Sequence, residues 1–331
     1  MFNKINIKWL AGIFLLLLLL VLLAMPRREK STSRSFKSEL TDFDSAKITA
    51  INIYPKNGGE MITLERNAGN WSVKDATGTY NAANAQADEM IKTLFDLTAK
   101  RLASKSKDKQ GYYQVDDSTG IRVQAIAGSK TVADVYVGKF NYQQPPQGAN
   151  PYMRQQQGTM TTFIRMTKSN DIYAVDGFLS MTFGRTVADL RDRKVLGVNK
   201  DKVSKVSFNS PAGDFNLIKQ DSIWMIDGLV TDSASAAEYI SGLSFVSNSA
   251  FLTENAVMDK TPQYVLTIEA EDLTEPVKVN AYVSDTTNRF AITSSTNKGT
   301  YFSGNTGGLF DQLFPTKNSF FEKEEELTEE E

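Results

Sequence analysis

The chain has 331 residues, enough for two ordinary domains, and its 41% hydrophobic and 23% charged content is typical of a folded protein. A formal net charge of −2 gives no overall positive field of the kind that nucleic-acid-binding proteins carry, so we expect no nucleic-acid partner. The absence of histidine and cysteine excludes disulfides, Ser-His-Asp and Cys-His catalysis, and the zinc, haem and iron–sulfur sites that use those ligands. We therefore expect no catalytic residue, no cofactor and no metal site, and a protein that is not an enzyme.

The amino-terminal segment predicts a membrane anchor. Trp9 to Met25 is an uncharged, mostly apolar run, which as a helix would rise roughly 26 Å and, with Lys8 reaching the headgroups, would span a bilayer. A cleaved signal peptide is the alternative, but a cut after Ala24 would place Leu22 where a small residue is required. We expect residues 1–45 to form an uncleaved anchor and basic linker, with residues 9–25 in the lipid bilayer.

The flanking charges leave the orientation of this anchor open. Residues 1–40 hold seven lysines and arginines against two glutamates, and most of these cations follow the apolar run, which alone favours a cytoplasmic body. However, the segment before the run is short and positive itself, and large domains can translocate despite flanking charge.

The body of the chain is predicted to be a tandem repeat of two sheet-forming units. The alternating strand Lys47–Ile53 is matched by Lys202–Phe208, and each is followed by a hairpin whose second strand begins at a tryptophan, Trp71 or Trp224. A helix with one apolar face is then predicted in each unit. The apolar residues are Ile91, Leu94 and Leu97 in the first unit and Ile240, Leu243 and Val246 in the second. Ser235 and Glu238 have the spacing of a capping box at the start of the second helix.

Four further strands recur in the same order. In the first unit they are Ile121–Ala125, Val132–Tyr136, Thr162–Met166 and Ile172–Val175; in the second they are Val265–Glu269, Val277–Ala281, Arg289–Thr293 and Thr300–Phe302. The fold class is therefore predicted to be α+β: an N-terminal transmembrane helix followed by two repeats, each a mostly antiparallel sheet with one packed helix. The first repeat covers 46–190, and the linker and second repeat cover 191–316.

Two segments fall outside the repeat pattern. Residues 141–161, rich in Gln, Pro and Gly, occur only in the first repeat and are expected to form an insert loop; Tyr142, Tyr152 and Arg154 would be its contact residues if it binds a ligand. Residues 317–331 are expected to form an acidic disordered tail, for which the alternative is an arm that binds a basic partner.

Four sequence patterns are candidate sites. The matched tryptophans could stack on a ligand, but a tryptophan that ends a hairpin beside a helix is more often part of the core. Ser-x-x-Lys occurs at Ser104, Ser106 and Ser295 without the helix start that serine acyl transfer needs. Gly304–Gly308 lacks the Lys-Ser/Thr of a nucleotide loop and predicts a turn into the segment Leu309–Phe314. Carboxylates at turns are expected for backbone reasons and show no EF-hand spacing: Asp116, Asp117, Asp171, Asp176 and Asp227.

The order of these elements resembles a known family. The linker Ala188–Leu196, the segment Asn199–Val206 after it, and the repeated succession of tryptophan, polar turn and aliphatic helix are similar to the bacterial domain of unknown function family 4340, over residues 46–316. The resemblance implies a single-pass bacterial inner-membrane protein, with an extracytoplasmic body, that accompanies ABC-type transport or gliding-motility systems. It implies no catalytic residues.

We therefore expect a non-enzymatic, membrane-anchored envelope protein that acts as a scaffold or accessory subunit and binds partner subunits of such a system. Sheet edges and the insert loop are its candidate contact surfaces. The alternative is a cell-wall or polysaccharide-binding module, which requires a groove lined by exposed aromatic side chains. Hydrolysis by two facing carboxylates is a third and weaker hypothesis.

Overall fold

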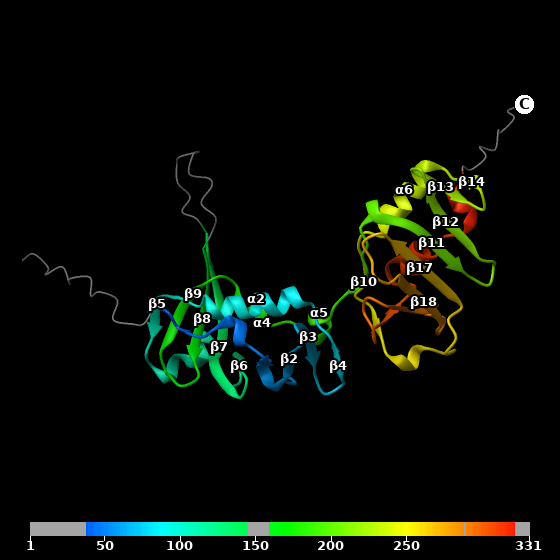
Figure 1. The fold of residues 1–331 in the computed structure, drawn as a ribbon. Helices are drawn as coiled ribbons and strands as arrows, with labels where there is room; N and C mark the ends of the chain where they lie inside the picture. The colour runs from blue at the N-terminus through cyan, green and yellow to red at the C-terminus, as the bar shows by residue number, and fades with distance from the viewer. Residues whose placement is uncertain (1–37, 145–158, 288, 322–331) are drawn as a thin grey trace, which may run out of the picture.

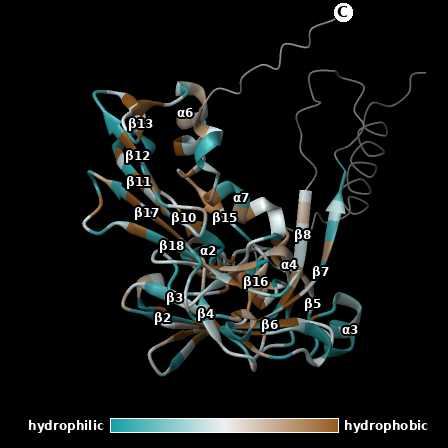
Figure 2. Ribbon diagram, turned by 90° about the vertical axis from the view of Figure 1, so that its right-hand side faces the viewer, coloured by the Kyte–Doolittle hydropathy of each residue, from teal (hydrophilic) through white to brown (hydrophobic). Residues whose placement is uncertain are grey.

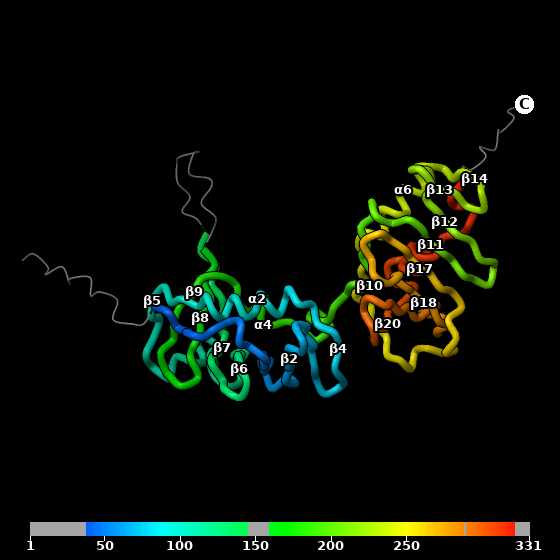
Figure 3. The backbone as a smooth tube through the Cα atoms, in the orientation of Figure 1, coloured from blue at the N-terminus to red at the C-terminus, as the bar shows by residue number. Residues whose placement is uncertain are grey.

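The structure is a computed structural model, and it describes residues 38–144, 159–287 and 289–321. The described chain forms two modules, each built on a nine-stranded antiparallel sheet, and the chain passes once from one to the other just before β10 (Figures 1 and 3). We call residues 38–190 the first module and residues 191–321 the second. The predicted α+β class with mostly antiparallel sheets is confirmed.

The first module contains these helices and strands: η1 Ser45–Lys47, β1 Ala50–Tyr54, η2 Lys56–Gly58, β2 Ile62–Asn67, β3 Asn70–Lys74, β4 Thr79–Asn81, α2 Asn84–Phe95, β5 Ala99–Ser104, η3 Lys107–Lys109, α3 Gln110–Tyr113, β6 Ile121–Ala127, β7 Lys130–Gln143, β8 Thr159–Met166, β9 Ile172–Asp176, α4 Leu179–Phe183 and α5 Val187–Leu190.

The second module contains these: β10 Lys194–Leu196, η5 Lys200–Lys202, β11 Val203–Asn209, β12 Phe215–Gln220, β13 Ile223–Ile226, β14 Leu229–Val230, α6 Ser233–Gly242, β15 Val246–Ser247, β16 Phe251–Leu252, η6 Glu254–Ala256, β17 Tyr264–Ala270, β18 Val277–Val283, β19 Phe290–Ser294, β20 Tyr301–Ser303, η7 Thr306–Gly308, α7 Leu309–Leu313 and η8 Lys317–Phe320.

The two sheets have the same strand order. It is β4-β3-β2-β1-β6-β7-β8-β9-β5 in the first module and β14-β13-β12-β11-β17-β18-β19-β20-β16 in the second, while β10 and β15 form a separate pair. The register also matches: Ile51 pairs with Leu64 and Ala125, and Val206 pairs with Leu217 and Ile268. Every strand of one sheet thus has a counterpart in the other, as the predicted repeat requires.

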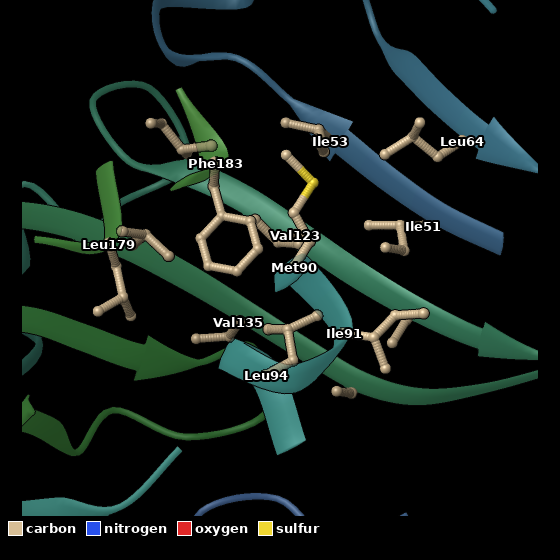
Figure 4. Close-up of a cluster of buried hydrophobic side chains, with 14 of the residues drawn as sticks. Ile51, Ile53, Leu64, Met90, Ile91, Leu94, Val123, Val135, Leu179 and Phe183 are labelled. Carbon is tan, nitrogen blue, oxygen red and sulfur yellow. The ribbon is translucent and has the colours of Figure 1, made fainter. Parts of the chain in front are cut away.

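The core of each module lies between one sheet face and one helix. In the first module, Met90, Ile91 and Leu94 of α2 pack on the sheet near Val123 and Val135 (Figure 4), and all five are buried. Alternate strand residues reach this face because side chains on a strand point to opposite sides in turn. The six residues predicted to form the helix faces are all buried, but only Ile91, Leu94 and Ile240 lie in helices. The predicted faces run past the helix ends: Leu97 follows α2, Leu243 caps α6, and Val246 lies in β15.

The start of the second helix differs from the sequence prediction. Asp232, not Ser235, is the N-cap residue of α6, and its carboxylate accepts a hydrogen bond from the backbone N–H of Ser235 at 2.7 Å. The Ser235–Glu238 capping box is therefore wrong, because Ser235 already lies in the first turn and receives the cap instead of supplying it.

Ordered structure also extends past the expected boundaries of the repeats. At the amino end, the Thr41 hydroxyl donates to the Leu94 carbonyl at 2.6 Å, so part of the segment expected to be a linker packs on the first module. At the carboxyl end, Phe320 in η8 is 1% exposed, which corrects the boundary expected at 316. Its counterpart in the first module is Leu190 in α5. The backbone N–H groups of Ala83 and Asp232 donate to the carbonyls of Leu190 and Phe320 respectively.

Three predicted features fall wholly or partly outside the described residues. The transmembrane helix at 9–25 is one, and within the described residues no helix is long and apolar enough to cross a membrane. Residues 145–158 of the insert loop and 322–331 of the tail are the others. The outer parts of the expected insert, 141–143 and 159–161, are instead strand residues of β7 and β8.

Candidate functional site

The joint between the modules is centred on Arg191. Its guanidinium lies over the ring of Tyr80 at 4.1 Å and over the ring of Phe251 at 3.8 Å, so one cation bridges an aromatic residue from each module. Burial lowers the pKa of Arg191, and the two ring faces offset part of that desolvation of the charge. The arrangement links β4 of the first sheet to β16 of the second.

Hydrogen bonds close the same joint. The Asn81 amide at the end of β4 donates to Oδ1 of Asn297 at 2.9 Å and to the carbonyl of Lys298 at 3.0 Å. Asn297 is 2% exposed and donates to the carbonyls of Asp192 and Lys194. The second module therefore contacts the end of β4 at Asn81, although Thr79 and Asn81 remain largely exposed.

The counterpart of this edge in the second module is β14, and it is open. Its two residues, Leu229 and Val230, are 61% and 60% exposed, and Ile223 on the neighbouring strand is 51% exposed. In the described part of the chain, β14 pairs with β13 alone. An uncovered sheet edge with apolar side chains is a ready docking site for another chain.

A row of paired residues across this edge differs in chemistry between the two modules. In the first module the row is Glu65, Ser72 and Asn81; in the second it is Ile218, Met225 and Val230. The register is the same, and both rows lie on the sheet side away from the core. We call the set Ile218, Ile223, Met225 and Val230 the β14 surface; Leu229 pairs with the buried Ile226 and therefore lies on the core side of the sheet.

Each module also has a cavity at a matching place. The first measures about 440 Å³ and is lined by Ile62, Ile121 and Phe183 among others. The second measures about 400 Å³ and is lined by aromatic residues that include Phe215, Tyr264 and Phe314. Ile62 and Phe215 begin β2 and β12, and Ile121 and Tyr264 begin β6 and β17. The two cavities therefore lie at equivalent strand ends of the two modules.

Three of the four charged side chains that line the second cavity form ion pairs, and the fourth, Asp214, accepts hydrogen bonds from Asn209 and Ser210. Arg289 contacts Asp311 at 3.2 Å, and Lys317 contacts Asp227 at 2.5 Å. The Arg289 guanidinium also lies over the Phe310 ring at 4.5 Å. The aromatic lining and paired rim suit an uncharged ligand better than a strongly ionic one.

The two matched tryptophans differ in burial. Trp71 is 2% exposed, and its indole N–H donates to Asp88 at 3.2 Å, so the core role predicted for it is confirmed. Trp224 is only half-buried and packs against the edge of the second core. Because neither ring stands free, the pair does not form a stacking platform.

The other sequence candidates have structural roles. Gly304–Gly308 leads through η7 into α7, as the predicted turn requires. Ser104 ends β5, and Lys107 begins η3, so this Ser-x-x-Lys pair does not lie at a helix start that serine acyl transfer would need. Tyr142 is 51% exposed on β7, whereas Tyr152 and Arg154 lie outside the described residues.

Of the aspartates expected to serve turns, Asp116 acts on the backbone as predicted, whereas Asp117, Asp176 and Asp227 contact Arg165, Lys100 and Lys317. Asp116 accepts hydrogen bonds from the backbone N–H groups of Ser118 and Thr119, both at 2.9 Å, and from their hydroxyls. Burial raises the pKa of Asp116, but these four donors outweigh it, and the pKa lies well below its usual range. Among the described residues, no group of three or more acidic side chains is placed to hold a metal ion.

Sequence reasoning missed the joint and the β14 surface. A signal for the latter was present, because aligning the two repeats places Ile218 against Glu65 and Val230 against Asn81. Whether those apolar residues face the core or solvent depends on strand register, which periodicity alone does not specify for adjacent apolar residues such as Leu217 and Ile218.

Comparison with known proteins identifies a family for the matched region. The family model described as Domain of unknown function (DUF4340) matches residues 71–269, more than half of the chain, from β3 of the first module to β17 of the second. No curated protein and no solved structure matches the chain.

Proposed function

The chain belongs to the family described as Domain of unknown function (DUF4340), and from this starting point we propose that it is a non-enzymatic, membrane-anchored envelope protein. In this proposal residues 9–25 anchor it in the bacterial inner membrane, with an extracytoplasmic body. It acts as a scaffold or accessory subunit, and its second module binds a partner subunit of an ABC-type transport or gliding-motility-like system.

The observation that carries the partner-binding proposal is the contrast between the two edge rows. At one register, the first module has Glu65, Ser72 and Asn81, and the second has Ile218, Met225 and Val230. The fold therefore tolerates polar residues at these positions, so folding does not explain the exposed apolar row. A partner that covers the β14 surface would remove that row from water, as the core of a protein interface does.

The contrast also supplies the test. We would replace the second row by the first, with Ile218→Glu, Met225→Ser and Val230→Asn in the full chain, and compare crosslinked complexes recovered from detergent-solubilised membranes. We expect the unchanged protein to recover a transporter-type membrane subunit and the row exchange to lose it. A matched control is Met258→Ser, because Met258 is 72% exposed and lies outside the β14 surface.

Two results would count against this function. Recovery of the same subunit by the row-exchanged protein would remove the β14 surface from the proposal. Failure of the unchanged protein to recover any transporter-type subunit would remove the accessory role itself.

The membrane placement has its own test. Alkaline carbonate should leave the full chain in the membrane fraction if residues 9–25 span the bilayer. Protease added to intact spheroplasts should degrade the body if it is extracytoplasmic. Release by carbonate, or protection from protease until the membrane is opened, would contradict the anchor or the orientation.

A cell-wall or polysaccharide-binding role is the second candidate, and the aromatic cavity of the second module supports it. Tyr264 and Phe314 line this cavity of about 400 Å³, and both remain half-buried. Under this alternative, Tyr264→Ala reduces retention of the protein on an insoluble cell-wall fraction, whereas the row exchange does not. The scaffold proposal predicts the opposite pattern for partner recovery.

A further inference from the structure

The end of the β7–β8 hairpin has an exposed apolar face. Phe140, Tyr142 and Met160 are 46%, 51% and 45% exposed, and Figure 2 shows the two strands projecting from the first module. Tyr142 and Met160 are cross-strand partners, so the three side chains form one patch. We call it the hairpin face.

Strand register explains why this face is apolar. Val137 and Ile164 are buried partners on the core side of the sheet. An irregularity between Val137 and Phe140 brings Phe140 and Tyr142 back to that side, where a regular strand would have turned them away. The Phe140 ring contacts Phe178 at 4.2 Å between centroids. The hairpin face therefore lies on the core side of the sheet, beyond the part of that side on which the helices pack.

The first described residue, Ser38, lies in the same cross-strand row as the hairpin face. The Ala99 N–H donates to the Ser38 carbonyl at 2.7 Å, and paired residues lead from there across the sheet. The full row is Ser38, Ala99, Val175, Thr162 and Phe140. Four strand spacings amount to about 19 Å, so the entry of the chain and the hairpin face lie at the same end of the first module.

The length of the preceding chain keeps this end near the expected membrane. Residues 26–37 separate the predicted span from Ser38, and at full extension they reach at most about 40 Å. Five of the residues in that segment are basic, Arg27, Arg28, Lys30, Arg34 and Lys37, which draws the segment toward anionic headgroups. The hairpin face is therefore held within reach of the bilayer surface.

We propose that the hairpin face contacts the interfacial region of the lipid bilayer and holds the first module against the membrane. This proposal rests on the anchor of the proposed function. Tyrosine suits such a site because its ring is apolar while its hydroxyl stays hydrated, and Phe140 and Met160 supply apolar area beside it. The β14 surface, in the other module, then remains available to a partner protein.

The absence of cysteine from the chain makes a direct test possible. Single-cysteine variants of the full chain would carry an environment-sensitive fluorophore at the hairpin face (Tyr142→Cys) or at a control position (Tyr112→Cys). Both tyrosines are exposed, at 51% and 65%. Tyr113, beside the control residue, packs in the small cluster on the opposite face of the same sheet. A third variant, Leu17→Cys, reports on the anchor.

The proteins would be reconstituted in vesicles of phosphatidylethanolamine and phosphatidylglycerol. Quenching would then be compared between aqueous iodide and nitroxides attached to lipid chains. We expect iodide quenching at position 142 to be several-fold weaker than at position 112, and lipid nitroxides to quench the fluorophore at 142 but not at 112.

The outcomes separate this inference from the anchor on which it rests. If position 17 is not quenched by lipid nitroxides, the anchor fails. If position 17 is quenched and positions 142 and 112 behave alike, the anchor stands and the hairpin contact is overturned. Protection of position 142 from iodide without nitroxide quenching would mean that a second copy covers the face, which also overturns the lipid contact.

Discussion

Asn81 of the first module donates a hydrogen bond to Asn297 of the second, with 2.9 Å between Nδ2 and Oδ1. Asn297 also donates to the carbonyls of Asp192 and Lys194 in the segment between the modules. One buried side chain therefore connects the β4 edge, the linker and the second sheet. Together with Arg191 between Tyr80 and Phe251, it gives the joint a defined geometry instead of a loose tether.

The first prediction concerns Asn297. Asn297→Ala removes the donor to the part-buried carbonyls of Asp192 and Lys194, which should lower the free energy of unfolding by about 1–3 kcal/mol. Urea unfolding of the detergent-solubilised full chain measures this. Asn305→Ala is the control, because that side chain is exposed and donates to the Thr287 carbonyl at the surface, and its cost should stay within about 0.5 kcal/mol. Equal costs would show that Asn297 does not hold the joint.

The second prediction is a pH dependence at Asp134. Burial raises the pKa of Asp134, but hydrogen bonds from Arg122, Thr167 and Gln124 outweigh it and lower the pKa overall. A carboxylate with a lowered folded-state pKa stabilises the fold above its unfolded pKa of about 3.9 and loses that contribution as the pH falls below it. Unfolding free energy should therefore decrease on acidification below about pH 4.

Asp134→Asn should flatten this acid dependence and lower stability at pH 7 by about 1–2 kcal/mol, since Arg122 loses its charged partner. Chemical unfolding at a series of pH values measures both effects. Asp272→Asn, at an exposed turn, should keep the unchanged profile. An Asp134→Asn protein with that same profile would contradict the assignment.

Much of the fold was predictable because its signals are local. Strand alternation around Ile51 and Val206, and the three-residue steps from Ile91 and from Ile240, each report one buried face. The helix start at Asp232 was missed because Ser235 and Glu238 offer the same spacing one turn later, and only the backbone conformation distinguishes them.

The candidate site was less predictable because it depends on long-range pairing. Asn81 and Asn297 are separated by 216 residues, and neither stands in a recognisable motif. The β14 surface is defined by which side of the sheet Ile218 and Val230 occupy, and one residue of register reverses that side. Local patterns therefore specify the modules, whereas tertiary pairing specifies the surfaces.

The third prediction distinguishes the two tryptophans. Trp71→Ala removes a ring that is 2% exposed and should cost about 3–5 kcal/mol in unfolding free energy. Trp224→Ala removes a half-buried ring and should cost about half as much, in proportion to the apolar area buried. Trp71→Phe keeps most of the packing but loses the hydrogen bond to Asp88, so its cost in unfolding free energy should lie between those of Trp224→Ala and Trp71→Ala. Equal costs for the two alanine variants would contradict the difference in burial.

The fourth prediction concerns the close approach of Gly138 to α3. A Cβ atom at Gly138 would lie 2.3 Å from the Tyr113 carbonyl oxygen and 2.6 Å from a Val115 methyl group, so Gly138→Ala should destabilise the first module by about 1–3 kcal/mol. Gly111→Ala is the matched control, because the nearest atom to its new Cβ is 3.7 Å away. In thermal unfolding, Gly138→Ala should lower the midpoint temperature and Gly111→Ala should not. An equal midpoint for both variants would show that the strand can move away from α3.

The fifth prediction tests where the second module ends. Truncation after Phe321 removes only residues outside the described fold and should leave unfolding unchanged. Truncation after Thr316 also removes Phe320, which is 1% exposed and packs against Phe208, Phe215 and Tyr239. Loss of this ring alone, as in Phe320→Ala, should cost about 3–5 kcal/mol, and the longer truncation should cost at least as much. Urea unfolding followed by fluorescence in a Trp9→Phe, Trp71→Phe background, where Trp224 is the single fluorophore, would report on this module. An unchanged midpoint after truncation at Thr316 in that background would place the boundary at 316.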